Sequence, residues 1–307
     1  MSFAYDTKEE LCREHVTRKC CTLAEAYGVL LFCNSFTPNE VRITTECAPF
    51  ALQLPRLFWK AFGVHFDEQP EEVGPSLKAT FLLQDPASMA VILDTYGYRP
   101  ENSVALHINY AMLEEECCRA AFLRGAFLAG GSVTDPAKRY HLELVTSHYH
   151  VNRELQALLL EMGFQPKETT RKSNYLTYFK QSGAIEDFLT SIGAPLSAME
   201  VMNAKVEKHL RNGVNRRFNC DVANLDKAVE AAQEQIEAIR RIEAGVGLDT
   251  LPDKLRETAA LRVEHPELSL SQLAELCDPP ITKSALNHRL RKLMELSRTG
   301  GAEEESL

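Results

Sequence analysis

The sequence lacks an apolar run long enough to cross a bilayer. Its longest strongly apolar stretch, Ala120–Gly131, contains Arg124 and is shorter than the roughly 20 residues that a transmembrane helix needs. The segment Met1–Glu14 is charged and lacks the apolar core of a signal peptide. We therefore expect a cytoplasmic protein without a membrane partner.

Cysteine is sparse and is not arranged in the usual metal-binding motifs. The nine cysteines are odd in number, and none stands in a Cys-x-x-Cys pair. This pattern disfavours a disulfide framework and a closed zinc site, which needs four convergent ligands. Two pairs are vicinal, Cys20-Cys21 and Cys117-Cys118. We expect reduced, buried thiols that pack as small apolar side chains, with no metal, no cofactor and no small-molecule substrate.

The remaining composition is typical of a folded protein. The 307 residues are 45% hydrophobic and 25% charged, which suggests two domains with substantial cores. The net charge of −9 argues against nucleic acid as a partner, but part of it comes from Asp67–Glu72 and from an acidic tail at residues 300–307. The distribution of basic residues is therefore more informative than their sum.

Residues 18–97 resemble residues 115–194. A shift of 97 residues places Cys20-Cys21 on Cys117-Cys118 and gives six identities in sixteen consecutive positions. The same shift matches Arg42 with Arg139 and Thr80 with Thr177. We predict a duplicated α+β domain over residues 1–194.

Each copy is predicted to alternate helices and strands. The expected elements are 23–32, 41–45, 49–62, 77–83 and 87–96 in the first copy, and 120–129, 140–146, 152–162, 175–180 and 184–192 in the second. Gly28 and Gly125 lie inside the two opening helices, where glycine costs about 1 kcal/mol relative to alanine. Close packing of two backbones would explain both glycines. We therefore predict that they face each other in a helix pair.

Residues 195–248 are predicted to form a helical linker with basic and asparagine residues. Two helices are expected, at 196–211 and 225–242, with a break at Asn212-Gly213 and the polar run to Asn224. A solvated connector and a phosphate-binding surface both fit this segment. The candidate phosphate contacts are Lys205, Lys208, Arg211, Asn215, Arg216 and Arg217.

Residues 249–299 are predicted to form three short helices. Pro252 suits a first helical position, Ser269 and Gln272 form a capping-box pattern, and Thr282 can cap a helix that runs to about Leu296. A short helix, a turn at 278–280 and a longer helix are the layout of a helix-turn-helix, here over about Leu268–Thr299. An interaction module of three helices with a basic face would show the same pattern.

The last predicted helix has a leucine stripe opposite polar and basic residues. At 100° per residue, Leu286, Leu290 and Leu293 share one side and define the buried face. A helix of this kind places polar side chains on base edges and phosphates of the major groove. The candidate DNA-binding residues are Thr282, Lys283, Ser284, Asn287, His288, Arg289, Arg291, Lys292 and Arg298.

The opening helices resemble a known motif. Phe122–Val133 resembles the helix motif of the LAGLIDADG homing endonucleases, and Glu25–Phe36 resembles a degenerate copy of it. The resemblance implies a duplicated αββαβ-type domain with pseudo-twofold symmetry, in which two helices pack at the axis and a saddle of strands lies on DNA. The metal-binding carboxylates of that family correspond to Cys33 and Gly130, which cannot serve as hard oxygen ligands. We therefore expect no catalytic residues and no nuclease activity.

With the helix-turn-helix included, nearly the whole chain resembles the WhiA family of bacterial DNA-binding regulators. The most specific stretches are 124–133, 215–225 and 278–292. The resemblance implies a nucleoid-associated transcription factor for double-stranded DNA, acting in sporulation or in cell division and chromosome segregation, with other regulators as further partners. Two alternatives stay open: a nuclease with displaced acids, such as Glu25 and Glu143, and a DNA-associated scaffold for protein interactions.

Overall fold

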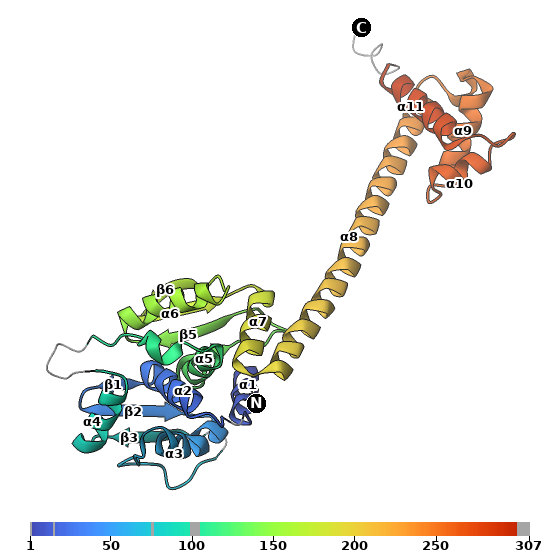
Figure 1. Cartoon of the computed structure of the whole chain (residues 1–307). Coiled ribbons are helices and arrows are strands. Elements are labelled where there is room, and N and C mark those ends of the chain that lie inside the picture. The colour runs from blue at the N-terminus through green and yellow to red at the C-terminus, as the bar shows by residue number, and fades with distance from the viewer. Residues whose placement is uncertain (1, 15, 75–76, 99–104, 300–307) are drawn as a thin grey trace. The chain divides into compact units, whose positions relative to one another are not determined.

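The computed structural model describes residues 2–14, 16–74, 77–98 and 105–299 and divides into two compact units, Met1–His209 and Leu210–Leu307 (Figure 1). The first unit mixes helices and strands, and the second is helical, so the predicted fold class is confirmed. Among the described residues, every helix is too short or too polar to span a bilayer.

The first unit contains one arrangement twice, after the helix α1 (Phe3–Cys12). The first copy comprises α2 (Lys19–Phe32), β1 (Ser35–Thr37), β2 (Glu40–Thr45), α3 (Ala48–Phe62), β3 (Ala79–Leu83) and α4 (Pro86–Thr95). The second comprises α5 (Glu116–Gly130), β4 (Gly131–Val133), β5 (Leu142–Thr146), α6 (Tyr149–Glu161), β6 (Lys167–Arg171), β7 (Asn174–Phe179) and α7 (Ser182–Ile192). A 3-10 helix, η1 (Tyr110–Leu113), precedes α5.

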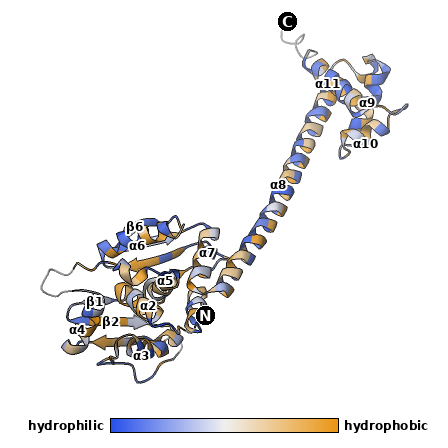
Figure 2. Cartoon of the chain, viewed as in Figure 1, coloured by the Kyte–Doolittle hydropathy of each residue, from blue (hydrophilic) through white to orange (hydrophobic). Residues whose placement is uncertain are grey.

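The strands of each copy form one antiparallel sheet. The strand orders are β1-β2-β3 and β4-β5-β7-β6. Buried and more exposed residues alternate along β2 and β5, which places one face of each sheet against the core. In the described part of the first copy, the counterpart of β6 is a single bridge between Glu68 and Leu82. Figure 2 shows hydrophobic residues along β2 and in α2 and α5, whereas β6 is polar and exposed.

The gapless repeat extends only to the first short strand of each copy. Ser35 pairs with Arg42, seven residues further on, whereas Ser132 pairs with Glu143, eleven residues further on. The hairpin is therefore four residues longer in the second copy. Exposed loops tolerate insertions of this kind. The predicted match of Arg42 with Arg139 is wrong, since Arg139 lies in this longer loop.

The match of Thr80 with Thr177 also fails. Thr80 is exposed, with its hydroxyl 3.3 Å from that of Thr44. Thr177 is buried and donates to Asn152 Oδ1 at 2.8 Å. The two threonines face opposite sides of their sheets, as a register shift of one residue requires.

The helices α2 and α5 pack against each other at the centre of the first unit. A Cβ atom on Gly28 would lie 2.0 Å from the carbonyl oxygen of Phe122, and one on Gly125 would lie 2.0 Å from that of Glu25. No larger residue fits at either position unless the helices move apart. The predicted close contact of the two helices at these glycines is confirmed.

The linker is one continuous helix, α8 (Pro195–Ala244), of 50 residues. The predicted break at Asn212-Gly213 is wrong. A glycine inside a helix costs only about 1 kcal/mol, and after Pro195 the segment contains no proline to interrupt the hydrogen bonds. A Cβ atom on Gly213 would have nothing within 4 Å, so this glycine serves no close contact.

The second unit contains η2 (Leu248–Thr250), α9 (Asp253–Glu264), α10 (Leu270–Glu275) and α11 (Lys283–Thr299). Ser269 and Gln272 form the predicted capping box, and Thr282 Oγ1 accepts a hydrogen bond from Ala285 N at 3.2 Å. Pro252 is the N-cap of α9 rather than its first residue, because its ψ of 143° is extended. Ile239 and Ile242 at the end of α8 belong to the core of this unit.

The predicted helix-turn-helix region starts at about Leu268, just before its first helix, which begins after the predicted cap Ser269. Leu268 lies in the bend between α9 and α10, and α10 itself begins at Leu270. The carbonyl oxygen of Leu268 accepts a hydrogen bond from Arg262 Nη1 at 3.0 Å, and its partly buried side chain packs against the core of the second unit. Leu268 therefore belongs to the connection that supports α10, because the capping Ser269 sets the helix start after it. This geometry does not present Leu268 to DNA.

Candidate nucleic-acid interface

The helix α11 has one buried and one exposed face. Leu286, Leu290 and Leu293 are at most 1% exposed and pack with Leu273 of α10, which confirms the predicted buried side. Asn287 is half-buried at the edge of this stripe. The candidate residues with exposed side chains are Thr282, Lys283, Ser284, His288, Arg291, Lys292 and Arg298.

Arg289 lies toward α9 instead. Its Nη1 is 3.3 Å from Glu257 Oε2 and 3.4 Å from the carbonyl oxygen of Lys254, and its side chain is only 17% exposed. The position predicted for Arg289, on the flank of α11, is correct, but α9 packs against that flank. Arg289 therefore links α11 to α9, and this geometry does not present it to DNA.

Three of the exposed basic residues extend along α11. Arg291 and Lys292 lie at its middle and Arg298 near its end. Lys292 Nζ is 3.4 Å from Glu295 Oε2, and both side chains are more than half exposed. An exposed pair of this kind contributes little stability, so Lys292 can exchange the carboxylate for a phosphate.

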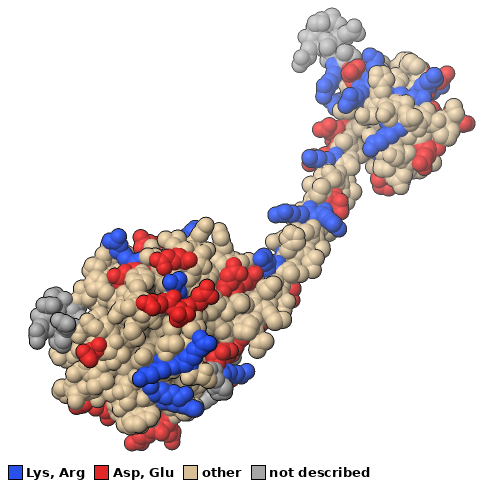
Figure 3. All heavy atoms as spheres, viewed as in Figure 1, with Lys and Arg blue, Asp and Glu red and all other residues tan. Residues whose placement is uncertain are grey.

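The basic residues of α8 divide into two groups. Lys205 pairs with Glu186 at 3.4 Å. Lys208 Nζ donates to the carbonyl oxygen of Pro136 at 2.6 Å and lies 4.3 Å from the ring centroid of Tyr140, so it holds α8 to the first unit. The remaining candidates, with exposed side chains, are Arg211, Asn215, Arg216 and Arg217. Figure 3 shows basic side chains at intervals along α8 and on the second unit.

The C-terminal ends of α2 and α5 carry no carboxylate at the positions that the LAGLIDADG motif would use. Cys33 Sγ lies 3.1 Å from the carbonyl oxygens of Leu30 and Ser35, and burial raises its pKa to about 12. A Cβ atom on Gly130 would lie 2.5 Å from the carbonyl oxygen of Val145. A protonated thiol and a glycine without space for a side chain offer a divalent cation no oxygen ligand.

A cavity of about 380 Å³ lies beside these helix ends. Its lining includes Tyr5 and Lys8 of α1, Asn34, Ser132 and one acid, Glu46. Burial lowers the pKa of Lys8 to about 8, so near neutral pH this amine is mostly charged. A cation in the cavity would meet a positive charge and a single exposed carboxylate, whereas metal-dependent hydrolysis needs several oxygen ligands.

The two acids of the nuclease alternative, Glu25 and Glu143, each contact other charged side chains. Glu25 is fully buried in α2, with Oε2 3.4 Å from Arg124 Nε, and burial raises its pKa to about 7 even though Arg124 opposes this shift. Glu143 lies on β5, between His141 at 3.1 Å and Arg171 at 3.2 Å. They occupy different elements and do not form a paired-carboxylate site.

The vicinal cysteines form a group that the sequence analysis did not predict. Cys20, Cys21, Cys117 and Cys118 bring their sulfur atoms within 4.8 Å of one another. Their identical positions in the two copies were the available signal, since symmetry-related residues near the axis of a helix pair meet each other.

Comparisons with known proteins agree with this architecture. The family description "WhiA LAGLIDADG-like domain" matches residues 119–211, and "WhiA C-terminal HTH domain" matches residues 214–297. A relative named "Probable cell division protein WhiA" from Alkaliphilus metalliredigens is 37% identical, covering 97% of this chain and 98% of its own. The relative of the same name from Ruminiclostridium cellulolyticum is 36% identical and covers 97% of both chains.

A solved structure also matches nearly the whole chain. It is the crystal structure of full-length DUF199/WhiA from Thermatoga maritima, with a TM-score of 0.59 and 22% identity, covering 98% of this chain and 99% of that one. A duplicated LAGLIDADG-like domain followed by a helix-turn-helix unit is thus the class of protein that the fold defines. The chain belongs to the WhiA family.

Proposed function

We propose that this protein is a sequence-specific DNA-binding regulator that cleaves no DNA and acts in cell division. The observation that carries the proposal is the exposed polar and basic face of α11, opposite a fully buried leucine stripe. Support for the biological role comes from the name of its relatives, "Probable cell division protein WhiA". Roles in sporulation and chromosome segregation, a nucleoid location in the cytoplasm and contacts with other regulators belong to the same proposal.

The chemistry of the side chains suggests which residues of α11 contact bases and which contact phosphates. Asn287 and Arg291 can form paired hydrogen bonds with adenine and guanine edges, and Ser284 and His288 lie beside them on α11. Lys292 and Arg298 suit phosphate contacts, which set position and affinity but not sequence preference. In this proposal, residues 249–299 form the unit that recognises the DNA sequence. Residues 195–248 form the linker, and residues 1–194 form the duplicated domain.

The exposed residues of α8 add a second proposed contact with phosphates. Arg211, Arg216 and Arg217 carry positive charge, and Asn215 lies between them. Lys208 is excluded from this surface because its ammonium group is bound to the first unit. Affinity contributed by α8 would be independent of sequence and would fall with salt.

The absence of cleavage rests on the residues at the ends of α2 and α5. Cys33 and Gly130 supply no oxygen ligand, and Lys8 would repel a cation nearby. A plasmid-nicking assay with Mg²⁺ and Mn²⁺ tests this part. We expect no nicking, and metal-dependent nicking that disappears in Glu25→Gln or Glu143→Gln would establish the nuclease alternative.

The DNA-binding part is tested by selection from a random duplex library with the full-length protein. We expect enrichment of one sequence motif by the wild type and loss of that motif by Asn287→Ala. Enrichment of no motif, with weak binding that is independent of α11, would favour the scaffold alternative.

A further inference from the structure

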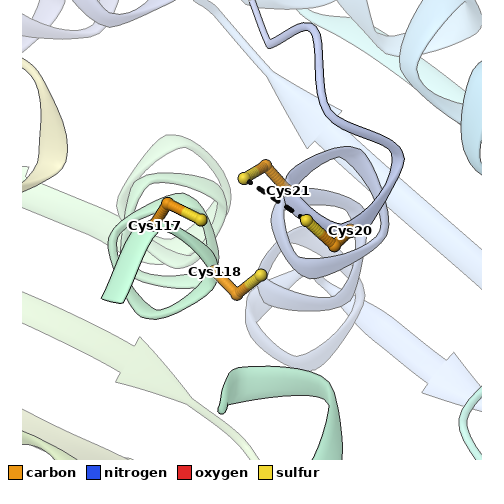
Figure 4. A group of neighbouring side chains, drawn as sticks. All are labelled: Cys20, Cys21, Cys117 and Cys118. Carbon is orange, nitrogen blue, oxygen red and sulfur yellow. Dashed lines mark hydrogen bonds between the residues drawn. The ribbon is translucent and has the colours of Figure 1, made fainter. Parts of the chain in front are cut away.

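Four cysteine sulfurs meet at the N-terminal ends of α2 and α5. Cys20 and Cys21 lie in the first turn of α2, and Cys117 and Cys118 lie in the first turn of α5. All four sulfur atoms lie within 4.8 Å of one another, and the Sγ atoms of Cys20 and Cys21 are 3.9 Å apart. Figure 4 shows the four side chains directed into the space between the two helices.

We propose that these four cysteines bind one Zn²⁺ ion. Zinc in a structural site is tetrahedral, with Zn–S bonds of about 2.3 Å, so its four sulfur ligands stand about 3.8 Å apart. The sulfur separations here are of that size, and shifts of about 1 Å or less at the widest pair complete the tetrahedron. Four thiolates select a soft, tetrahedral ion over Mg²⁺ or Ca²⁺, which take oxygen ligands.

Two helix N-termini and one arginine favour thiolates here, against the acidic segment Glu114–Glu116 that precedes Cys117. A zinc ion with four thiolates carries a net charge of −2, and the N-terminal ends of both helices point their positive dipole ends at it. The N-cap residues of α2 and α5, Arg18 and Glu115, make no capping hydrogen bond with their side chains, while the N–H of Cys118 donates to the carbonyl oxygen of Glu115 at 2.9 Å. The guanidinium of Arg18 adds a positive charge, with Nη1 3.7 Å from Cys117 Sγ.

The helix pair holds the four ligands in place. Gly28 and Gly125 let the backbones touch about two turns beyond the cysteines, and this contact fixes the separation of the two first turns. Cys21 and Cys118 are buried, whereas Cys20 is exposed, which leaves an entry path for the ion. Because the protein would fill all four coordination positions, the site is structural, and it would join the two copies at the end opposite Cys33 and Gly130.

The test is the metal content of the full-length protein, purified under reducing conditions without added metal. We expect about one zinc per chain, loss of the ion to a strong chelator, and a lower melting temperature after its removal. Adding Co²⁺ to the stripped protein should give the visible absorption bands of tetrahedral cobalt with thiolate ligands.

Variants separate binding from folding. Cys20→Ser changes an exposed ligand and should lower zinc affinity at least tenfold, while its metal-free melting temperature stays that of stripped wild type. The double variant Cys21→Ser/Cys118→Ser should retain no zinc. Cys220→Ser, an exposed cysteine on α8, is the matched control and should behave as wild type.

Thiol alkylation under native conditions gives a second measurement. With zinc bound, these four cysteines should be protected together, and the chelator should expose them together. Reduced wild type that holds no zinc and gives no cobalt bands would overturn the proposal, as would iron with inorganic sulfide, or disulfides among these cysteines that persist in the reduced protein.

Discussion

The two units of this protein place their ionic groups differently. In the first unit, the pair Glu25–Arg124 lies inside the core, beside two helices whose backbones touch at Gly28 and Gly125. In the second unit, Arg262 is buried and Arg289 lies toward α9, but Arg291, Lys292 and Arg298 of α11 lie on the surface. The first unit therefore keeps the packing of a LAGLIDADG-like scaffold without acids at Cys33 and Gly130, while the exposed polar and basic side chains of α11 belong to the second unit.

The largest expected effect tests the packing of the first unit. Gly125→Ala would place a Cβ atom 2.0 Å from a backbone oxygen of α2, so the helices must separate. We expect a loss of about 3 kcal/mol or more in the free energy of unfolding, at the upper end of overpacking costs. Gly183→Ala in α7, where a Cβ atom would have nothing within 4 Å, is the control. Equal denaturation midpoints for the two variants would show that the helices are not in close contact.

The stability of the first unit should depend on pH through the ionisation of Glu25. Burial raises its pKa to about 7 from the ordinary value of 4.5, so the folded unit favours the protonated acid. The stability that depends on this group is complete below pH 4.5 and is lost as pH rises through 7, by an amount on the order of 3 kcal/mol. Urea unfolding between pH 4.5 and 8 should show this decline in wild type relative to Glu25→Gln. Parallel curves would contradict the assignment.

Two neighbouring arginines of α11 should have separate roles. Arg289→Ala removes the contacts with Glu257 and the carbonyl oxygen of Lys254, and we expect it to destabilise the second unit by about 1–3 kcal/mol. Arg291→Ala should weaken DNA binding and leave the melting temperature unchanged, since its side chain is exposed. Thermal melts and binding isotherms of both variants distinguish the roles, and the reverse result would place Arg289 at the interface.

The smallest expected effect concerns Lys292. If this residue contacts a phosphate, Lys292→Ala should reduce the salt dependence of binding, the slope of log K against log salt, by about one unit for every duplex. Lys60→Ala, on an exposed position of α3, is the control and should leave the slope unchanged. A slope that changes for only one duplex would indicate that Lys292 reads a base.

Local patterns in the sequence were sufficient to predict much of the fold. The equal positions of Gly28 and Gly125 predicted the helix pair, and the spacing of Leu286, Leu290 and Leu293 predicted the buried side of α11. These features depend on helical periodicity and on steric limits, which a single sequence records.

The predictions that failed or were missing concern loops and contacts between segments that are distant in the sequence. The longer hairpin in the second copy shifted Arg139 away from its predicted match, because loop length follows no periodic pattern. The contact of Arg289 with Glu257, and the approach of the two vicinal cysteine pairs, depend on which helix packs against which. Only the assembled structure shows these contacts.

The central claim is that α11 selects the DNA sequence, and the affinities of full-length variants for the selected duplex and for a scrambled duplex test it most directly. Asn287→Ala should lower the ratio of the two affinities by roughly 5- to 100-fold, which corresponds to about 1–3 kcal/mol of lost discrimination. Lys292→Ala should weaken both affinities and leave their ratio unchanged. If Asn287→Ala and alanine variants of the exposed residues Ser284, His288 and Arg291 kept the wild-type ratio, sequence selection would reside in another part of the chain and the account would be wrong.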